Sequence, residues 1–274
     1  MRSTNPEHGK RPQVWALAAL VAAAGSIFAA AQAPPSANPA PAPPAPTAPQ
    51  PAPAPPAPHF VVVLDAAHGG NDPGARLSGQ PEKTFTLALS VRLRSLLAAR
   101  GIQVVTTRES DSTIDVDRRA ELANHANAQA CISLHASESG SGVHLFASSL
   151  APTPPQRFSA WKTAQAAWVT RSLALAGVVN SALLHAGLSV TLGRTALAAI
   201  DSMTCPAVAI EVAPERATSG AVTAGLDDQG YQARVAEALA AALLEWKSEA
   251  RQPLSPAIRP SSSSCCSPLR WPWV

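Results

Sequence analysis

A run of prolines and alanines near the N-terminus limits where this chain can fold. Residues 34–58 read PPSANPAPAPPAPTAPQPAPAPPAP, and no side chain in the run is larger than that of Gln. With almost nothing apolar to bury beyond alanine, such a segment cannot offset the entropy of ordering its backbone. We therefore predict that residues 34–58 form an extended linker of polyproline-II type, and that the folded part of the chain follows it.

The segment before the linker has the layout of an export signal. A short basic head with Arg2, Lys10 and Arg11 precedes an uncharged stretch, residues 14–33, that is rich in Ala, Leu and Val. This order is typical of a secretory signal, and an uncut stretch of about 20 apolar residues is long enough to span a bilayer. We expect residues 1–33 to be a signal peptide or membrane anchor, rather than a buried alanine-rich helix. The chain would then act in the periplasm or outside the cell.

The C-terminal segment also lacks the composition of a packed domain. Residues 248–274 are dense in Ser and Pro and include the vicinal pair Cys265 and Cys266. We predict a disordered tail there, and the role of the two cysteines stays open. Residues 59–247 remain as a single domain, which is long enough to bury a substantial core.

Charge and cysteine usage exclude several classes of protein. The formal net charge is only +3, and the charged residues are interspersed, so nothing indicates a nucleic-acid partner. Four cysteines are too few, and too irregularly spaced, for a disulfide scaffold or a zinc ribbon. Cys131 and Cys205 lie beside apolar runs, and we expect both to be buried as small hydrophobic side chains.

Strand-like and helix-like segments alternate within residues 59–247. Runs rich in β-branched and apolar residues predict strands at residues 59–65, 102–108, 130–135, 142–147 and 205–212. Apolar residues at helical spacing predict helices at residues 82–100, near 120–126, at 161–185 and at 231–246. The alternation predicts an α/β domain, with a mostly parallel, mixed sheet of five or six strands and helices on both faces.

Three of the predicted strands end at a residue able to bind a metal or carry a proton. These residues are His68, His135 and Glu211, and a further carboxylate, Glu82, stands at a predicted helix start. The carboxyl ends of parallel strands gather at one edge of the sheet, where ligands bind. Two imidazoles and one carboxylate around an open position suit a catalytic zinc, with Glu211 as the proton carrier.

Each of these residues alone also has a plainer interpretation. A histidine near a strand end is often a capping residue, and a glutamate at a helix start is favourable to the helix dipole. Glu211 is harder to explain in this way, because it ends the apolar run PAVAIE, and a buried carboxylate is costly without a partner. Spacing alone therefore leaves the zinc hypothesis and the structural one both open.

The order of the sequence motifs favours the zinc hypothesis. Seven segments follow one another between residue 61 and about residue 244: LDAAHGGNDPGA, GQPEK, TTR, RAELAN, ISLHAS, GVHLF and CPAVAIE. In order and approximate spacing they resemble the zinc-dependent N-acetylmuramoyl-L-alanine amidases of the amidase-3 type. The resemblance implies zinc ligands at His68, Glu82 and His135, and a catalytic role for Glu211. It also implies peptidoglycan as the substrate, cleaved between N-acetylmuramic acid and L-alanine.

The chain departs from the family pattern on the substrate side. Ala66 and Ala67 stand where the family usually has Pro-Gly, so the turn that presents His68 must avoid a conformation reserved for glycine. Ser137 replaces a common Asn, and VAPER follows the strand that carries Glu211 in place of Gly-Phe. Some members of the family carry a long inserted regulatory helix. This chain has no clear counterpart of it, although residues 161–185 have room for a short one.

Three other functions compete with this one. Another zinc peptidase acting on the stem peptide would share the metal chemistry but not the motif order. A wall-binding module without catalysis would not need all four candidate residues, and a purely structural periplasmic domain would need none. The stem-peptide preference, a regulatory protein, the oligomeric state and cleavage of the leader cannot be predicted from the sequence.

Overall fold

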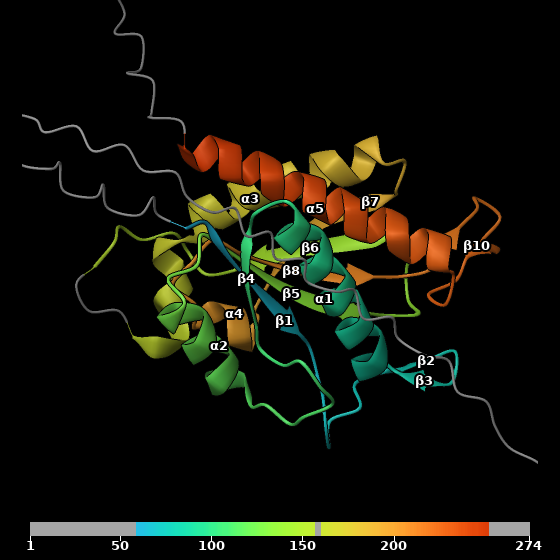
Figure 1. Cartoon of the computed structure of the whole chain (residues 1–274), viewed down its shortest axis with the longest axis horizontal. Helices are drawn as coiled ribbons and strands as arrows, with labels where there is room; N and C mark the ends of the chain where they lie inside the picture. The colour runs from blue at the N-terminus through green and yellow to red at the C-terminus, as the bar shows by residue number, and fades with distance from the viewer. Residues whose placement is uncertain (1–58, 157–159, 252–274) are drawn as a thin grey trace, which may run out of the picture. The chain divides into compact units, whose positions relative to one another are not determined.

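The computed structural model describes residues 59–156 and 160–251 (Figure 1). The expected leader, the linker and nearly all of the expected tail lie outside the described residues. The centre of the domain is a six-stranded sheet with the order β4-β1-β5-β8-β6-β7. Its strands are β1 (Val61–Ala66), β4 (Gln103–Thr106), β5 (Ala130–Ala136), β6 (Val143–Ser148), β7 (Val190–Thr195) and β8 (Ala207–Val212).

The sheet is mixed but mostly parallel. Neighbouring strands are parallel at every position except one, because β6 and β8 run antiparallel. The carboxyl ends of β1, β5 and β8 therefore meet at one edge, together with the start of β6. The predicted fold class is confirmed.

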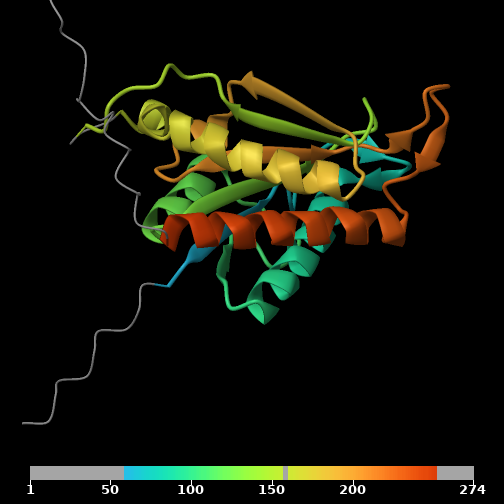
Figure 2. The ribbon, with the colours of Figure 1, turned by 90° about the horizontal axis from the view of Figure 1, so that it is seen from above.

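Helices cover both faces of the sheet unequally. One face carries three long helices, α1 (Glu82–Ala99), α3 (Val169–His185) and α5 (Gln229–Arg251), and Figure 2 shows α3 and α5 side by side. The other face carries shorter elements, namely α2 (Val116–His125), α4 (Ala198–Asp201) and the 3-10 helix η1 (Trp161–Ala167). The larger hydrophobic core lies under the long helices, and a smaller one lies under α2 and α4.

Two short hairpins complete the domain, and three details differ from expectation. The hairpins pair β2 (Arg76–Leu77) with β3 (Gln80–Pro81), and β9 (Glu215–Arg216) with β10 (Val222–Ala224). Strand β7 and helix α4 were not predicted, because β7 is a mostly exposed edge strand and α4 is a single turn. Strand β6 lies between β8 and β7. Helix α5 also continues past residue 247, the expected end of the domain.

A disulfide joins Cys131 of β5 to Cys205, just before β8. Both side chains are buried, as expected, but the disulfide between them was not predicted. The residues are 74 positions apart in the sequence, but β5 and β8 are neighbours in the sheet, so their Cα atoms lie 6.2 Å apart. Sequence spacing could not reveal this, because the pairing of β5 with β8 depends on the topology. Structural disulfides persist mainly in oxidising compartments.

No single helix within residues 59–156 and 160–251 is long and apolar enough to cross a membrane. The bent pair formed by η1 and α3 passes such a test by length and composition only.

Candidate metal centre and active site

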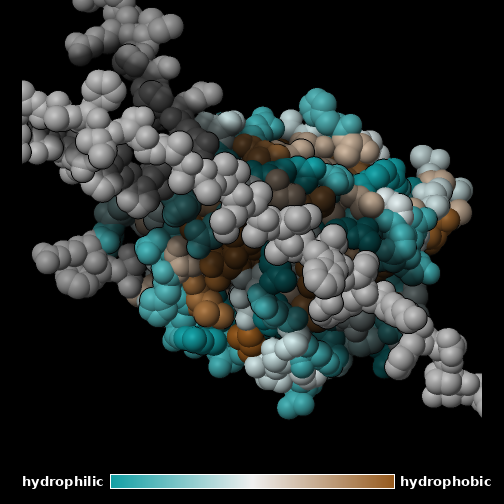
Figure 3. Space-filling view, in the orientation of Figure 1, coloured by the Kyte–Doolittle hydropathy of each residue, from teal (hydrophilic) through white to brown (hydrophobic). Residues whose placement is uncertain are grey.

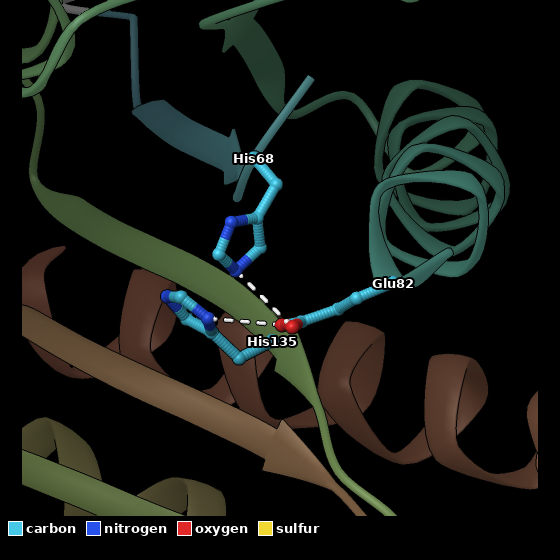
Figure 4. Close-up of side chains that lie close together, drawn as sticks. All are labelled: His68, Glu82 and His135. Carbon is cyan, nitrogen blue, oxygen red and sulfur yellow. Dashed lines mark hydrogen bonds and ion pairs between the residues drawn. The ribbon is translucent and has the colours of Figure 1, made fainter. Parts of the chain in front are cut away.

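Three of the residues singled out from the sequence meet at the edge where β1 and β5 end. His68 follows β1, Glu82 is the first residue of α1, and His135 lies near the end of β5. One side-chain nitrogen or oxygen from each lies within 4.8 Å of the others. Figure 4 shows dashed lines from the Glu82 carboxylate to both imidazoles. The structure thus brings together residues that are up to 67 positions apart (135 − 68).

Glu82 is the most buried of the three, with only 4% of its surface exposed. Its Oε2 lies 3.1 Å from Nε2 of His68, and its Oε1 lies 3.1 Å from Nδ1 of His135. Each oxygen also accepts a backbone N–H at 3.0 Å, from Ala75 and Ala136 respectively. Burial opposes ionisation, but these hydrogen bonds outweigh it and hold the pKa of Glu82 far below its usual range. The carboxylate is therefore ionised and fixed in place.

A second carboxylate, from Asp72, orients His68. Its Oδ2 lies 2.8 Å from Nδ1 of the imidazole, which leaves Nε2 to face Glu82. The backbones of Gly69 and Asp72 bond to each other in both directions and so close the turn that holds this contact. The hydrogen bond to Glu82, together with that to Asp72, raises the pKa of His68 despite its partial burial. A carboxylate on the far nitrogen of an imidazole is typical of metal-binding histidines.

Two buried arginines hold the backbone on which His68 stands. Arg119 donates to the main-chain oxygens of Ala66 and His68, each at 2.8 Å, and to the Asp65 carboxylate at 2.6 Å. Arg108 donates to the oxygens of Ala66 and Ala67, at 2.9 and 3.0 Å. Because the carbonyls of residues 66 to 68 all accept from these guanidinium groups, the turn is fixed by charge-assisted hydrogen bonds.

This arrangement accommodates the departure from Pro-Gly at residues 66 and 67. Neither alanine has a positive φ; the left-handed conformation falls on His68 itself, with φ of 62°. Non-glycine residues adopt this region at some cost, and they do so mostly where the surroundings hold them. The bonds from Arg119 and Asp72 to His68 supply that restraint.

Gly74 allows its loop to approach His68 and Glu82 closely. A Cβ atom at this position would lie 2.7 Å from Cδ2 of His68 and 2.8 Å from Oε2 of Glu82. Its φ of +65° is also unfavourable for other residues. Any larger residue here would displace the two side chains.

Glu211 lies on the strand next to His135. The two residues are register partners between β8 and β5, so their side chains emerge from the same face of the sheet. Neither Arg194 nor Arg216 pairs with it; both donate to main-chain oxygens instead. Within residues 59–156 and 160–251, no ion pair or side-chain hydrogen bond engages this carboxylate. Glu211 is not part of the cluster of His68, Glu82 and His135, and its carboxylate has no structural partner among the described residues.

A cavity of about 520 Å³ opens beside the two histidines. Residues 113–116, which lead into α2, line one side of it, and residues 196–200, which include the start of α4, line the other. His68 and His135 belong to its lining, and the remaining lining is mostly polar, with Asp65, Asp72, Arg119 and Ser133 beside Ala67 and Ala209. The cavity therefore opens directly onto two members of the candidate metal cluster.

Comparison with known proteins assigns the domain to a family. The model of the family Amidase_3, described as N-acetylmuramoyl-L-alanine amidase, matches residues 62–245. The chain belongs to this family. The match covers the whole sheet apart from the first residue of β1, and it includes all four candidate residues.

Individual relatives agree with this assignment. An N-acetylmuramoyl-L-alanine amidase of Mycobacterium tuberculosis is 34% identical over 140 residues, which are 49% of this chain and 56% of that protein. The amidase AmiA of Escherichia coli is 42% identical over 77 residues, 28% of this chain and 27% of that protein. Alignment with these curated relatives thus spans from about a quarter to about half of their length.

Solved structures share the fold. The catalytic domain of CwlV, an N-acetylmuramoyl-L-alanine amidase of Bacillus (Paenibacillus) polymyxa, superposes with a TM-score of 0.54 at 27% identity. That comparison covers 69% of this chain and 98% of the CwlV domain. The amidase Ami1 of Mycobacterium smegmatis shows the same fold, with a TM-score of 0.55 at 23% identity, covering 69% and 97% of the two chains.

Sequence reasoning missed the residues that support the centre. Asp72 stands four positions after His68, within the GGND turn, and its spacing gave no reason to single it out. Arg108 and Arg119 lie in the TTR and RAELAN motifs, which carried the family resemblance, yet no role was assigned to either arginine. A signal was available for Arg119 alone, which lies four residues before the buried Ala123 and so on the apolar side of its helix, where an arginine is not expected.

Proposed function

We propose that this chain is a zinc-dependent amidase that hydrolyses the bond between N-acetylmuramic acid and the L-alanine of the peptidoglycan stem. The observation that carries the proposal is the convergence of His68, Glu82 and His135 beside a cavity, in a domain of the amidase family. Two imidazole nitrogens and a carboxylate oxygen are the donor set of many catalytic zinc sites.

The residues fit zinc in chemistry as well as in number. His68, Glu82 and His135 would hold the zinc, which would supply Lewis acidity toward water and the scissile carbonyl. Glu82 contributes negative charge from an ionised, anchored carboxylate, and Asp72 keeps Nε2 of His68 directed inward. The chain thus presents its ligands already oriented, which reduces the cost of ordering them when the metal binds.

Glu211 is proposed to carry the proton. Its carboxylate takes a proton from the attacking water and then gives one to the departing nitrogen of L-alanine. Support comes from its register with His135 and from its freedom from structural ion pairs within the described residues. An amine is a poor leaving group until it is protonated, so the reaction needs such a carrier.

The domain is proposed to act in the periplasm or outside the cell. Residues 1–33 would serve as its signal peptide or membrane anchor, and residues 34–58 as the spacer. The Cys131–Cys205 disulfide supports an oxidising compartment. A polyproline-II spacer of this length would reach on the order of 75 Å, at about 3.1 Å per residue. Such a reach would let a tethered domain contact the wall.

Digestion of purified peptidoglycan tests the activity directly. The zinc-loaded protein should release stem peptides with a free N-terminal L-alanine and leave intact glycan, as identified by mass spectrometry. Cuts within the stem would instead indicate the rival peptidase, and zinc binding without any cleavage would indicate a wall-binding module. The position of the new ends decides among the three.

A further inference from the structure

One wall of the cavity beside the metal cluster is held mainly by side chains of other elements. Residues 196–200 line this cavity, and they begin the segment that leads from β7 toward β8, residues 196–205. Among the described residues, the backbone of this segment forms no hydrogen bond with the backbone of another element. Helix α4 belongs to the segment, and Figure 3 shows a hydrophobic area over the part of the molecule where α2 and α4 lie. We refer to residues 196–205 as the wall segment.

Gln165 of η1 holds the wall segment through its side-chain amide. This residue is completely buried, and its Nε2 donates to the main-chain oxygens of Met203 and Cys205 at 2.9 and 3.0 Å. The same nitrogen donates to the oxygen of Ile200 at 3.4 Å. Its Oε1 accepts a hydrogen bond from the Ser172 hydroxyl at 2.6 Å, which fixes the orientation of the amide. One buried side chain thus satisfies three main-chain oxygens of a segment that lies outside the sheet.

Gln165 is not part of the cavity lining, so it can influence a substrate only through the wall segment. Ile200 provides the connection, because its oxygen accepts from Gln165 while the residue itself lines the cavity. Asn124 of α2 also holds the segment. Its amide donates to the oxygen of Ser202 at 3.0 Å and accepts the N–H of Thr204 at 2.7 Å. The wall segment is therefore fixed from two elements, η1 and α2.

The side chains of the metal cluster are held by other groups. Among the described residues, the hydrogen bonds and ion pairs of these side chains involve Asp72, main-chain N–H groups and one another, and none involves the wall segment. A change in the position of the wall segment would therefore alter the space beside the cluster and leave the ligands in place. An effect on substrate binding can thus be separated from an effect on zinc binding.

We propose, on the basis of the amidase function proposed above, that Gln165 is a positioning residue of the reaction. It keeps the wall segment at the separation from residues 113–116 at which the cavity fits the substrate, and it does so without touching the substrate. If the wall segment held this position for only a fraction of the time, the apparent affinity for substrate would fall in proportion to that fraction. The residue should therefore act on KM rather than on the chemical step.

Gln165→Met tests the proposal, because methionine is similar in size to glutamine but cannot donate to the three oxygens. In the full, zinc-loaded chain, KM for muramyl pentapeptide should rise roughly three- to tenfold, with kcat changed less than about twofold and zinc content unchanged. Asn124→Ala should also raise KM, and it decides the question alone should Gln165→Met fail to fold. Gln232→Met is the matched control, since the Gln232 amide donates to the oxygen of Leu226, away from the cavity lining.

Hydrogen exchange reports on the wall segment without a substrate. Backbone amides of residues 197–204 should exchange roughly tenfold faster in Gln165→Met than in the parent protein or in Gln232→Met, while those of β5 and β8 do not change. Unchanged KM in the folded variants, a loss of kcat in place of a rise in KM, unchanged exchange, or loss of zinc would each overturn the positioning role. If the parent protein cleaves no muramyl pentapeptide, the amidase function itself fails, and the exchange result then describes only the structure.

Discussion

Arg119 donates a hydrogen bond at 2.8 Å to the main-chain oxygen of His68, although the two residues are 51 positions apart. The same guanidinium holds Ala66 and the buried Asp65 carboxylate. One side chain of α2 thereby sets both the position of a proposed ligand and the end of the strand that leads to it. This relationship gives the first of five predictions.

Arg119→Lys should weaken zinc binding while the domain still folds. A lysine keeps the charge but lacks the planar, multidentate geometry that satisfies Asp65, Ala66 and His68 together. We expect zinc affinity to fall about 10- to 100-fold, as for other residues that orient metal ligands. Competition titration with a zinc chelator measures this. Arg118→Lys, on the exposed side of the same helix, should match the parent protein. Unchanged zinc affinity in Arg119→Lys would assign the arginine to folding alone.

His68→Ala should abolish both zinc binding and hydrolysis, because an open catalytic site retains too few ligands when one is removed. A chelator should inactivate the parent protein, and added zinc should restore it. His125, at the end of α2, is not in the cluster, so His125→Ala is the control and should bind one zinc per chain. His144 and His185 should likewise be dispensable as ligands. Full metal content in His68→Ala would refute the ligand assignment.

Glu211→Gln should fold and bind zinc as the parent does, yet lose turnover by roughly a hundredfold or more, the scale of lost acid-base catalysis. The substitution nearly preserves size and removes only the titratable group. Zinc content, melting temperature and hydrolysis are to be measured on one preparation. Glu215→Gln, which removes a carboxylate paired with Arg234, serves as the comparison and should affect turnover little. Near-normal turnover by zinc-loaded Glu211→Gln would exclude the residue from the mechanism.

Zinc affinity should fall as the pH is lowered through the pKa of His68. Glu82 and Asp72 raise that pKa above 6.5, so protons compete with zinc at a higher pH than they would for an ordinary histidine. Asp72→Asn removes one cause, and the midpoint of the pH dependence should move to lower pH. Its zinc affinity at pH 8 should nevertheless drop about 10- to 100-fold, since the imidazole is less well oriented. A midpoint that does not move would contradict this account of Asp72.

Replacing both Cys131 and Cys205 by Ala should lower the free energy of unfolding by about 2–4 kcal/mol, because the bond closes a long loop of the unfolded chain. Denaturant unfolding, with and without a reductant, measures the loss. The reductant should lower the free energy of unfolding of the parent protein but not that of the double variant. Cys265→Ser combined with Cys266→Ser should leave unfolding unchanged. Equal stability of parent and double variant would mean that the disulfide does not form in solution.

The sequence alone was sufficient for the main elements and for the set of candidate residues. Strands β1, β5 and β8 are continuous apolar runs, and α1 and α5 have helical periodicity, so local pattern and burial agree. The placement of His68, His135 and Glu211 at strand ends follows from the parallel arrangement, which brings those ends to one edge. Strand β7 and helix α4 were missed because an exposed edge strand and a single turn carry little periodic signal.

Only the tertiary structure decided which distant groups touch. The order β4-β1-β5-β8-β6-β7 makes β5 and β8 neighbours, and this creates both the Cys131–Cys205 bond and the register of His135 with Glu211. The bonds of Arg119 to the His68 turn and of Trp161 to Asp117 likewise join segments more than 40 residues apart. Local pattern reports the preference of a segment for helix or strand and the side it buries. Contacts at such separation depend instead on how the elements pack, and that is settled by the free energy of the whole domain.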